Sequence, residues 1–223
     1  MGQKVNPKSL RLGIVNTWDS TWFADKKSYI AYLHEDIKIR HYLQEKLKDA
    51  GISSLKIERS KNKIAVNIYT SKPGIIIGRG GELIEVLRDD LNKKFKINFE
   101  INVKEVHKPQ ADPQIIAQNI ARQIEKRFPY RRAVKMALQK AKEAGVLGVK
   151  IYTGGRLNGV EISRGEFFKE GNIPLHTFRA DIAYASERAN TKYGVIGIKV
   201  WVYKGMIIKP KKSNDRMVVK TSA

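Results

Sequence analysis

Alternating apolar and polar positions predict three strands in the first half of the chain. Residues 63–70 alternate with the period of a half-buried strand, and residues 95–103 repeat this pattern more clearly. Residues 52–59 precede the first of these across a short turn, and we expect them to form a further strand. Between residues 70 and 95, leucines recur every four residues from Leu83 to Leu91, which predicts a helix with one apolar face.

A longer helix is predicted ahead of these strands, from Ser28 to Asp49. Ser28 is placed to cap its N-terminus, and Gly51 follows its C-terminus. Its apolar positions are expected to be Tyr29, Leu33, Ile37, Leu43 and Leu47. With a short apolar segment at residues 73–77, the predicted order from residue 28 to residue 106 is α-β-β-α-α-β.

Glycines separate the short apolar segment from the leucine helix. Gly78, Arg79, Gly80 and Gly81 form a G-x-x-G turn at the N-terminus of that helix. Glycines let a phosphate approach the backbone amides, and a helix N-terminus carries partial positive charge. An ordinary tight turn is the alternative for the tetrapeptide alone. The surrounding order of elements favours a type II KH module, whose loop clamps a single-stranded nucleic-acid backbone.

The second half of the chain begins with a proline-containing linker and then shows helical spacing. Ile116, Ile120 and Ile124 predict one helix, Phe128–Pro129 ends it, and residues 130–144 predict a second helix. The period then changes to that of strands, which are expected around residues 149–151, 160–162 and 196–202. A further strand is expected between His176 and Arg188, and a hairpin turn at residues 154–159. The C-terminal domain is thus expected to be two helices packed on an antiparallel sheet.

The chain as a whole is predicted to be α+β and to have four parts. They are a basic N-terminal arm, a type II KH domain, a C-terminal α+β domain and a basic flexible tail, at residues 1–16, 17–106, 107–208 and 209–223. The arm is expected to be disordered or ordered only against a partner. Trp18, Trp22 and Phe23 follow it, and we expect them to cap a core rather than to stack on bases, because large aromatic residues dominate cores.

The charge of the chain narrows the class of partner. Lys and Arg number 43 against 22 Asp and Glu, which gives a formal net charge of +21. Such an excess favours a polyanionic partner, with nucleic acid the leading candidate and an anionic membrane the second. No apolar run reaches about 20 residues, and the basic residues are spread over several elements, so we expect no membrane contact. No signal segment is recognised at the N-terminus, and we expect a cytoplasmic chain.

The sequence lacks the residue patterns of common enzyme sites. It contains no cysteine, which removes disulfides, thiolate zinc sites and cysteine nucleophiles. The four histidines are scattered without metal-ligand spacing. Glu82 follows Gly81 where a P-loop needs lysine, and a dinucleotide fingerprint starting at Gly78 would need glycine or alanine at Leu83. We expect no catalytic residue, no metal and no cofactor.

Four stretches, in order, resemble one family: the bacterial form of the third protein of the small ribosomal subunit. They are Met1–Pro7 with Arg11–Gly13, Pro73–Gly81, Tyr130–Lys135, and Pro174–Ile182 followed by Tyr193–Trp201. The resemblance covers the chain except for its C-terminal tail.

The resemblance implies a place on the solvent side of the small-subunit head, where the family binds small-subunit rRNA and lines the entrance of the mRNA channel. It implies the proteins S-ten and S-fourteen as neighbours, with S-two nearby. It also implies that Arg131, Arg132 and Lys135 face incoming mRNA and help to open mRNA helices. The spacing of these residues is consistent with this role, because Arg131 and Lys135 share a helical face opposite Val134 and Leu138. A solvated basic helix start is the alternative for the arginine pair.

The expected rRNA contacts lie in the arm and in the C-terminal domain: Lys4, Lys8, Arg11, Arg156, Arg164, His176 and Arg179. Phosphate contacts of this kind weaken steeply with salt. Many KH loops carry two variable residues with at least one basic side chain. This loop has Arg79 but a Gly80 without a side chain, so it is expected to attract phosphate less strongly. Contacts with mRNA are expected to read no sequence, and unwinding is expected to be passive.

Three functions of different classes are compatible with a basic KH-containing chain. They are a structural ribosomal protein that also guides mRNA, a free-standing KH regulator of single-stranded RNA, and a nucleic-acid hydrolase or lyase. The regulator would need neither a second domain matched along its length nor a basic arm, and the enzyme would need a metal or nucleophile constellation. We therefore predict the first function, for a chain that does not form a homo-oligomer.

Overall fold

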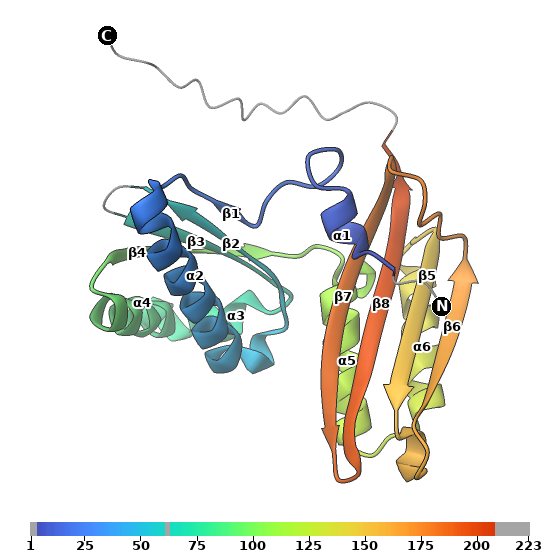
Figure 1. Cartoon of the computed structure of the whole chain (residues 1–223). Helices are drawn as coiled ribbons and strands as arrows, with labels where there is room; N and C mark the ends of the chain where they lie inside the picture. The colour runs from blue at the N-terminus through green and yellow to red at the C-terminus, as the bar shows by residue number, and fades with distance from the viewer. Residues whose placement is uncertain (1–3, 61–62, 208–223) are drawn as a thin grey trace.

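The computed structural model describes residues 4–60 and 63–207, which form two four-stranded sheets with a separate hydrophobic core beside each. Figure 1 shows the sheets side by side, with α2, α3 and α4 grouped around the N-terminal sheet and with α5 and α6 behind the C-terminal sheet. The predicted α+β fold class is confirmed. The predicted tail at residues 209–223 lies outside the described residues.

The described residues of the N-terminal half include these α-helices and strands: α1 Pro7–Leu10, β1 Ser20–Thr21, α2 Lys26–Lys46, β2 Ile52–Arg59, β3 Lys63–Thr70, α3 Pro73–Ile77, α4 Glu82–Phe95 and β4 Asn98–Glu105. Strands β2 and β3 are antiparallel, whereas β3 and β4 are parallel. A parallel pair needs a crossover, and α3 and α4 supply it. From α2 to β4 the observed order is the predicted α-β-β-α-α-β.

The core of this half forms where α2 and α4 cover the sheet. Ile39 and Leu43 of α2, Leu91 of α4 and Val66 of β3 are fully buried in one cluster. The alternation along β3 explains this arrangement, because every second side chain of a strand points to the same face.

The bounds of the long helix and of the third strand differ from those predicted, and the helix ends at Lys46 rather than Asp49. The long helix begins at Lys26 rather than Ser28, and the Ser28 hydroxyl donates a hydrogen bond to the backbone carbonyl of Asp25 instead of capping the helix. The third strand begins at Asn98 rather than residue 95, because Lys96 adopts a left-handed conformation (φ 56°) that ends α4. The backbone N–H of Phe99 then donates to the Asn92 side chain at 2.8 Å, which ties the start of the strand to the helix.

The C-terminal half contains two helices and four strands: α5 Pro113–Glu125, α6 Tyr130–Glu143, β5 Gly148–Gly155, β6 Arg164–Gly171, β7 Ala180–Thr191 and β8 Gly194–Met206. The strand order is β6-β5-β8-β7, and all three neighbouring pairs are antiparallel. Both helices bury apolar side chains in the cluster that also holds the inner residues of the sheet. The prediction of two helices packed on an antiparallel sheet is confirmed.

The strand predicted at residues 160–162 is wrong. A short 3-10 turn at Leu157–Gly159 follows β5, and the next strand begins at Arg164. Leu157 is fully buried and holds this connection on the core, whereas Val160 and Ile162 are exposed. The two β-branched residues therefore lie in a surface loop, and the predicted hairpin turn is longer than residues 154–159.

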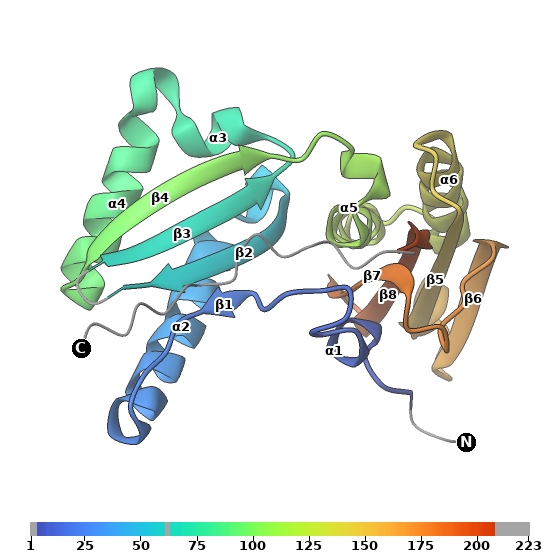
Figure 2. The same ribbon diagram turned by 90° about the horizontal axis from the view of Figure 1, so that it is seen from above.

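The N-terminal arm connects the two sheets, contrary to the prediction of a disordered segment or one ordered only against a partner. Helix α1 lies beside β7 of the C-terminal sheet, and β1 pairs with β2 of the N-terminal sheet (Figure 2). Between its described start at Lys4 and β1, the chain therefore passes from one sheet to the other. The two halves also meet directly, because the Ser53 hydroxyl donates to Asp112 at 2.6 Å.

The expectation that the early aromatic residues cap a core is wrong for two of the three. Phe23 is 92% exposed and Trp18 is 66% exposed. Trp22 is half-buried, and its indole N–H donates to the buried carboxylate of Asp36 at 2.8 Å. Asp36 also accepts a hydrogen bond from Arg59. Trp22, Asp36 and Arg59 thus form a polar cluster where we expected hydrophobic side chains.

Helix α2 also faces the core differently from the prediction. Its buried positions are Asp36, Ile39 and Leu43, whereas the expected core residues Tyr29, Leu33 and Ile37 are 40–49% exposed. The N-terminal half of α2 thus leaves an apolar surface uncovered. We call this surface the α2 apolar face, and it consists of Trp18, Phe23, Tyr29, Ile30, Leu33 and Ile37.

Candidate nucleic-acid interface

Helix α6 presents the most concentrated group of outward-facing cations predicted to bind RNA. Pro129 precedes its first residue, and its inward face is buried through Tyr130, Ala133, Val134, Leu138 and Ala141. Because these positions follow the helical period, the residues between them must point to solvent. Those residues include the three predicted mRNA contacts, Arg131, Arg132 and Lys135, and all three are exposed.

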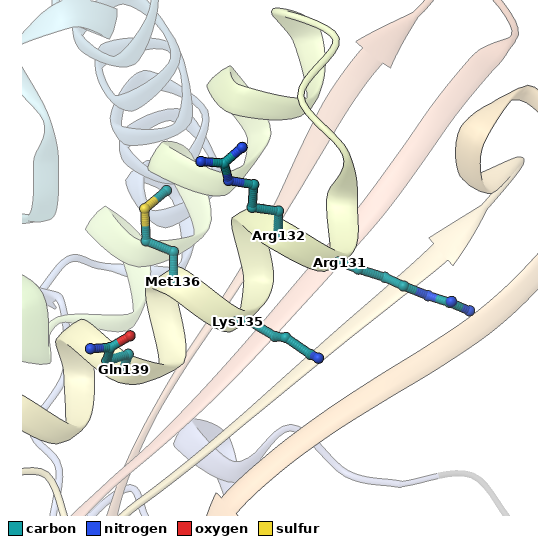
Figure 3. A pocket seen from close by; sticks show the side chains of 5 residues that line it. All are labelled: Arg131, Arg132, Lys135, Met136 and Gln139. Carbon is teal, nitrogen blue, oxygen red and sulfur yellow. The ribbon is translucent and has the colours of Figure 1, made fainter.

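The three cations line a shallow depression of about 500 Å³ together with Met136 and Gln139. Figure 3 shows that the Arg131 and Lys135 side chains point to one side of α6, whereas Arg132 and Met136 point to the other. The spacing of four residues within each pair accounts for this division. The depression is lined by three cations and by no carboxylate, so a chain of phosphates can lie across it.

Arg131 is held by a hydrogen-bonded network rather than free in solvent. Its Nη2 lies 3.1 Å from Oε1 of Glu166 on β6, and its Nε donates to the Tyr130 hydroxyl at 3.0 Å. The Tyr130 hydroxyl in turn donates to Glu166 at 2.9 Å. The hydrogen bonds from Arg131 and Tyr130 lower the pKa of Glu166, and the hydrogen bond to Glu166 raises the pKa of Arg131.

Arg132 and Lys135 differ from Arg131 in this respect. Within residues 4–60 and 63–207, neither side chain lies within ion-pairing distance of a carboxylate. The three predicted contacts are therefore unequal. Arg132 and Lys135 can meet an incoming phosphate directly, whereas Arg131 reaches it from a position fixed by Glu166.

The glycine loop joins α3 to the start of α4 in the N-terminal half. Gly78, Gly80 and Gly81 have φ angles of 74°, 64° and 88°, which residues other than glycine rarely adopt. A Cβ at Gly78 would also lie 2.6 Å from Cγ of Leu83. Arg79 is exposed on this loop, but Glu82 opens the helix behind it. The backbone geometry suits an approaching phosphate, while the local charge is close to balanced.

Arg11 contradicts its predicted role as a phosphate contact. Its side chain is fully buried, and its guanidinium donates to the carbonyls of Pro7, Leu175, Thr177 and Ala180 at 2.8–3.0 Å. Burial lowers its pKa, although the charge of a nearby aspartate acts in the opposite direction. Arg11 therefore fastens the arm to the C-terminal sheet, because each of its three guanidinium nitrogens donates to backbone carbonyls.

The other predicted rRNA contacts fall into two groups. Lys4, Arg164, His176 and Arg179 are exposed. Lys8 and Arg156 are half-buried and engaged, since Lys8 pairs with Asp19 and the Nε of Arg156 donates to the carbonyl of Val160 at 3.0 Å. Arg164 lies beside the α6 site, because its Nε is 3.4 Å from Oε1 of Glu166, the carboxylate that also pairs with Arg131.

Three residues of the α6 site were not predicted from the sequence. Met136 and Gln139 could have been found, because they continue the outward face at positions i+4 from Arg132 and Lys135. Glu166 could not, because it approaches from β6, a strand that the sequence pattern did not predict. No local spacing links it to Arg131.

The described part of the chain holds neither a metal-ligand cluster nor a membrane-spanning helix. Across residues 4–60 and 63–207, no three His, Asp or Glu side chains are grouped as metal ligands, and no helix is both long enough and apolar enough to cross a membrane.

Comparison with known proteins identifies both halves of the chain. The family model of the KH domain matches residues 38–111. The family model of the ribosomal protein S3 C-terminal domain matches residues 120–202. Small ribosomal subunit protein uS3 of Desulforamulus reducens is 51% identical over 95% of this chain and 96% of its own length. The uS3 protein of Enterococcus faecalis is 47% identical, over 97% of this chain and 99% of its own length. The chain therefore belongs to the uS3 family of small ribosomal subunit proteins and carries a KH RNA-binding domain.

Proposed function

We propose that this chain binds rRNA in the head of the small ribosomal subunit, in the cytoplasm, and contacts mRNA at the entrance of its channel. The observation that carries the mRNA contact is the group of exposed cations on α6, which lines one depression without a carboxylate. Counterion release from phosphates favours such contacts whatever the base sequence. This property suits a channel through which every message passes.

The proposed mechanism of unwinding is passive. Arg132 and Lys135 hold the phosphates of a single strand as it leaves a helix, and Arg131 offers a planar guanidinium from a fixed position. Met136 supplies an apolar contact beside them. Cations that hold the separated strand oppose its re-pairing, while ribosome movement supplies the work.

The proposed rRNA contacts are the exposed residues outside α6, together with the glycine loop. Lys4, Arg164, His176 and Arg179 remain candidates because solvent reaches them. Gly78–Gly81 offers backbone amides to a sugar-phosphate backbone. The division into an arm, a KH domain and a C-terminal domain at residues 16 and 106 also stays a proposal.

The α2 apolar face supports the proposed contacts with neighbouring ribosomal proteins. Trp18, Tyr29 and Leu33 line one hollow there, and Phe23 and Ile30 are 92% and 63% exposed. Exposed apolar patches commonly mark a protein interface. We assign this surface to one of the neighbours S-ten, S-fourteen and S-two, which the sequence resemblance implies.

The decisive experiment replaces Arg131, Arg132 and Lys135 together by alanine in the full chain. We expect variant ribosomes to assemble normally and to translate unstructured messages at the parental rate. Translation through a stable mRNA hairpin should slow several-fold, because the three cations that hold the separated strand are gone. The measurement is the rate of ribosome passage through the hairpin.

A double replacement, Lys140→Ala with Lys142→Ala, is the matched control. These lysines lie in the last turn of the same helix, outside the depression, so their removal should leave hairpin passage unchanged. Loss of subunit assembly in the triple variant, or equal slowing in the control, would contradict the proposed role of α6.

A further inference from the structure

The face of the C-terminal sheet that points away from α5 and α6 carries interleaved aromatic and basic side chains. In register order, Tyr152 of β5 lies opposite Phe167 of β6 and Lys199 of β8, and Lys150 of β5 lies opposite Lys169 and Trp201. Tyr184 of β7 lies opposite Trp201. We call this surface the outer sheet face, and it consists of Lys150, Tyr152, Phe167, Lys169, Tyr184, Arg188, Lys199 and Trp201. Figure 1 shows α5 and α6 on the other side of the sheet, whereas α1 lies against β7 on this face. Trp201, Ile173 and Leu175 pack there against one buried cluster.

Contacts between these residues hold the rings and cations side by side. The Lys150 ammonium lies 5.2 Å from the ring centroid of Phe167 and 5.3 Å from that of Trp201. Trp201 and Tyr184 are packed with ring centroids 5.3 Å apart. Phe167 remains 66% exposed, so one of its ring faces is open to a ligand.

Glycines let one aromatic side chain lie across the strands. Gly154 faces Gly165 on β6 and Gly197 on β8, which leaves a strip without side chains beside Tyr152. A Cβ at Gly154 would lie 3.0 Å from the Tyr152 ring, and a Cβ at Gly165 would overlap its hydroxyl. The ring therefore rests on the sheet over these glycines.

The charge on the outer sheet face is of one sign. This face carries four cations: Lys150, Lys169, Lys199 and Arg188. The side chains of Glu166, Glu170 and Glu187 point to the opposite face of the sheet, which the helices cover. There each glutamate has a helix partner, namely Arg131, Lys142 and Gln114 respectively. The remaining acidic residue of these strands, Asp181, lies at the start of β7, where its charge acts on Arg11.

Repulsion among the cations of the outer sheet face favours the binding of an anionic ligand. Burial lowers the pKa of Lys150, and the positive charges of Lys4 and Lys169 lower it further. A bound phosphate would relieve this repulsion. Rings with open faces beside phosphate-binding cations are the combination that single-stranded nucleic acids recognise, because bases stack on the rings while the backbone meets the cations.

We propose that the outer sheet face binds unpaired nucleotides of the small-subunit rRNA, with a base stacked on Phe167 and phosphates at Lys150, Lys169 and Lys199. The α6 depression lies on the helix side, so a message held there does not cross this face. The inference rests on the proposed association with rRNA, but it concerns a site separate from both α6 and the glycine loop.

The first test places a photoreactive benzoyl-phenylalanine at Phe167 of the full chain and assembles it into small subunits. Irradiation should join the chain to rRNA at unpaired nucleotides. Attachment to mRNA, to a ribosomal protein or to a continuous rRNA helix would overturn the proposal, as would the absence of any attachment in assembled subunits. Failure of the chain to enter subunits would instead count against the proposed function.

The second test compares binding of the full chain to a single-stranded and a duplex RNA of equal length. Phe167→Leu keeps apolar area but removes the ring, and it should weaken single-strand binding about tenfold. Phe167→Tyr should retain parental affinity, and Phe128→Leu, at an exposed phenylalanine between α5 and α6, should also have no effect. Equal losses for Phe167→Leu and Phe128→Leu, or an equal loss on duplex RNA, would overturn the proposal.

Discussion

At the scale of single residues, burial decides what a cation does. Arg11 and Lys135 both lie in stretches that resemble the family, yet Arg11 is fully buried against carbonyls and Lys135 is exposed beside a depression. A buried guanidinium must satisfy its donors within the protein, because leaving them unpaired is costly. An exposed ammonium keeps its donors for a ligand. The sequence alone does not tell the buried cation from the exposed one, since both residues are simply basic.

The contacts of Arg11 predict a loss of stability when it is replaced. Arg11→Ala leaves four carbonyls without their charged donor and should lower the free energy of unfolding by about 2–4 kcal/mol. Arg11→Lys should lose most of the same stability, because an ammonium cannot reproduce the fork of the guanidinium. Urea unfolding measures both effects.

The control for Arg11 is Lys8→Ala in the same arm. Lys8 forms a partly exposed ion pair with Asp19, so its replacement should change the free energy of unfolding by less than about 1 kcal/mol. If Arg11→Ala were as stable as Lys8→Ala but bound RNA more weakly, the buried anchoring role would be wrong.

The network around Arg131 predicts a pH dependence at the α6 site. Because hydrogen bonds from Arg131 and Tyr130 lower the pKa of Glu166 in the folded chain, the ion pair contributes stability at neutral pH. That contribution is lost as the pH falls through the lowered pKa of Glu166. Arg131→Met should raise the pKa of Glu166 towards its ordinary value, as measured by NMR titration of its carboxyl group. Lys135→Met is the control, and an equal rise there would contradict the specific pairing.

At the scale of elements, periodicity predicted most of the fold. Strands β2 and β3 match their predicted ranges, and α6 begins at the predicted residue 130. The alternation and the helical spacing are local properties, so they can be read without the rest of the chain. The outward face of α6 followed from the same spacing.

The elements that were not predicted depend on contacts distant in sequence. Strand β6 is an edge strand whose residues alternate only weakly between apolar and polar, and its place is fixed by pairing with β5. The buried face of α2 includes Asp36, which is stabilised there by Trp22 and Arg59. A pattern of hydrophobic residues cannot find a core position held by a carboxylate.

The glycine loop gives a prediction at this scale. A Cβ at Gly80 meets no atom within 4 Å, and the φ angle of 64° is one that Asn and Asp tolerate best after glycine. If the loop receives a phosphate, Gly80→Asp should bind protein-free small-subunit rRNA about two- to fivefold more weakly than Gly80→Asn at the same salt concentration. Equal binding of these two variants, which differ chiefly in charge, would show that no phosphate lies at the loop.

At the scale of the whole molecule, the arm and the charge explain how one chain can serve several nucleic-acid contacts. The arm ties the two sheets through Arg11 and β1, so that the glycine loop and α6 belong to a connected framework. Within a chain of net charge +21, exposed cations lie on the arm, α6 and the outer sheet face. The proposed function needs such a link between separate cationic surfaces, so that some of them can hold rRNA while another faces mRNA.

The central claim is that the exposed face of α6 contacts mRNA, and crosslinking tests it most directly. Messages with a single photoreactive uridine at successive positions downstream of the decoding site would be bound to small subunits and irradiated. We predict attachment to the peptide containing Arg132 and Lys135 from a few adjacent positions, and its loss in the triple alanine variant. Attachment of every downstream position to other peptides or to rRNA alone would contradict the account.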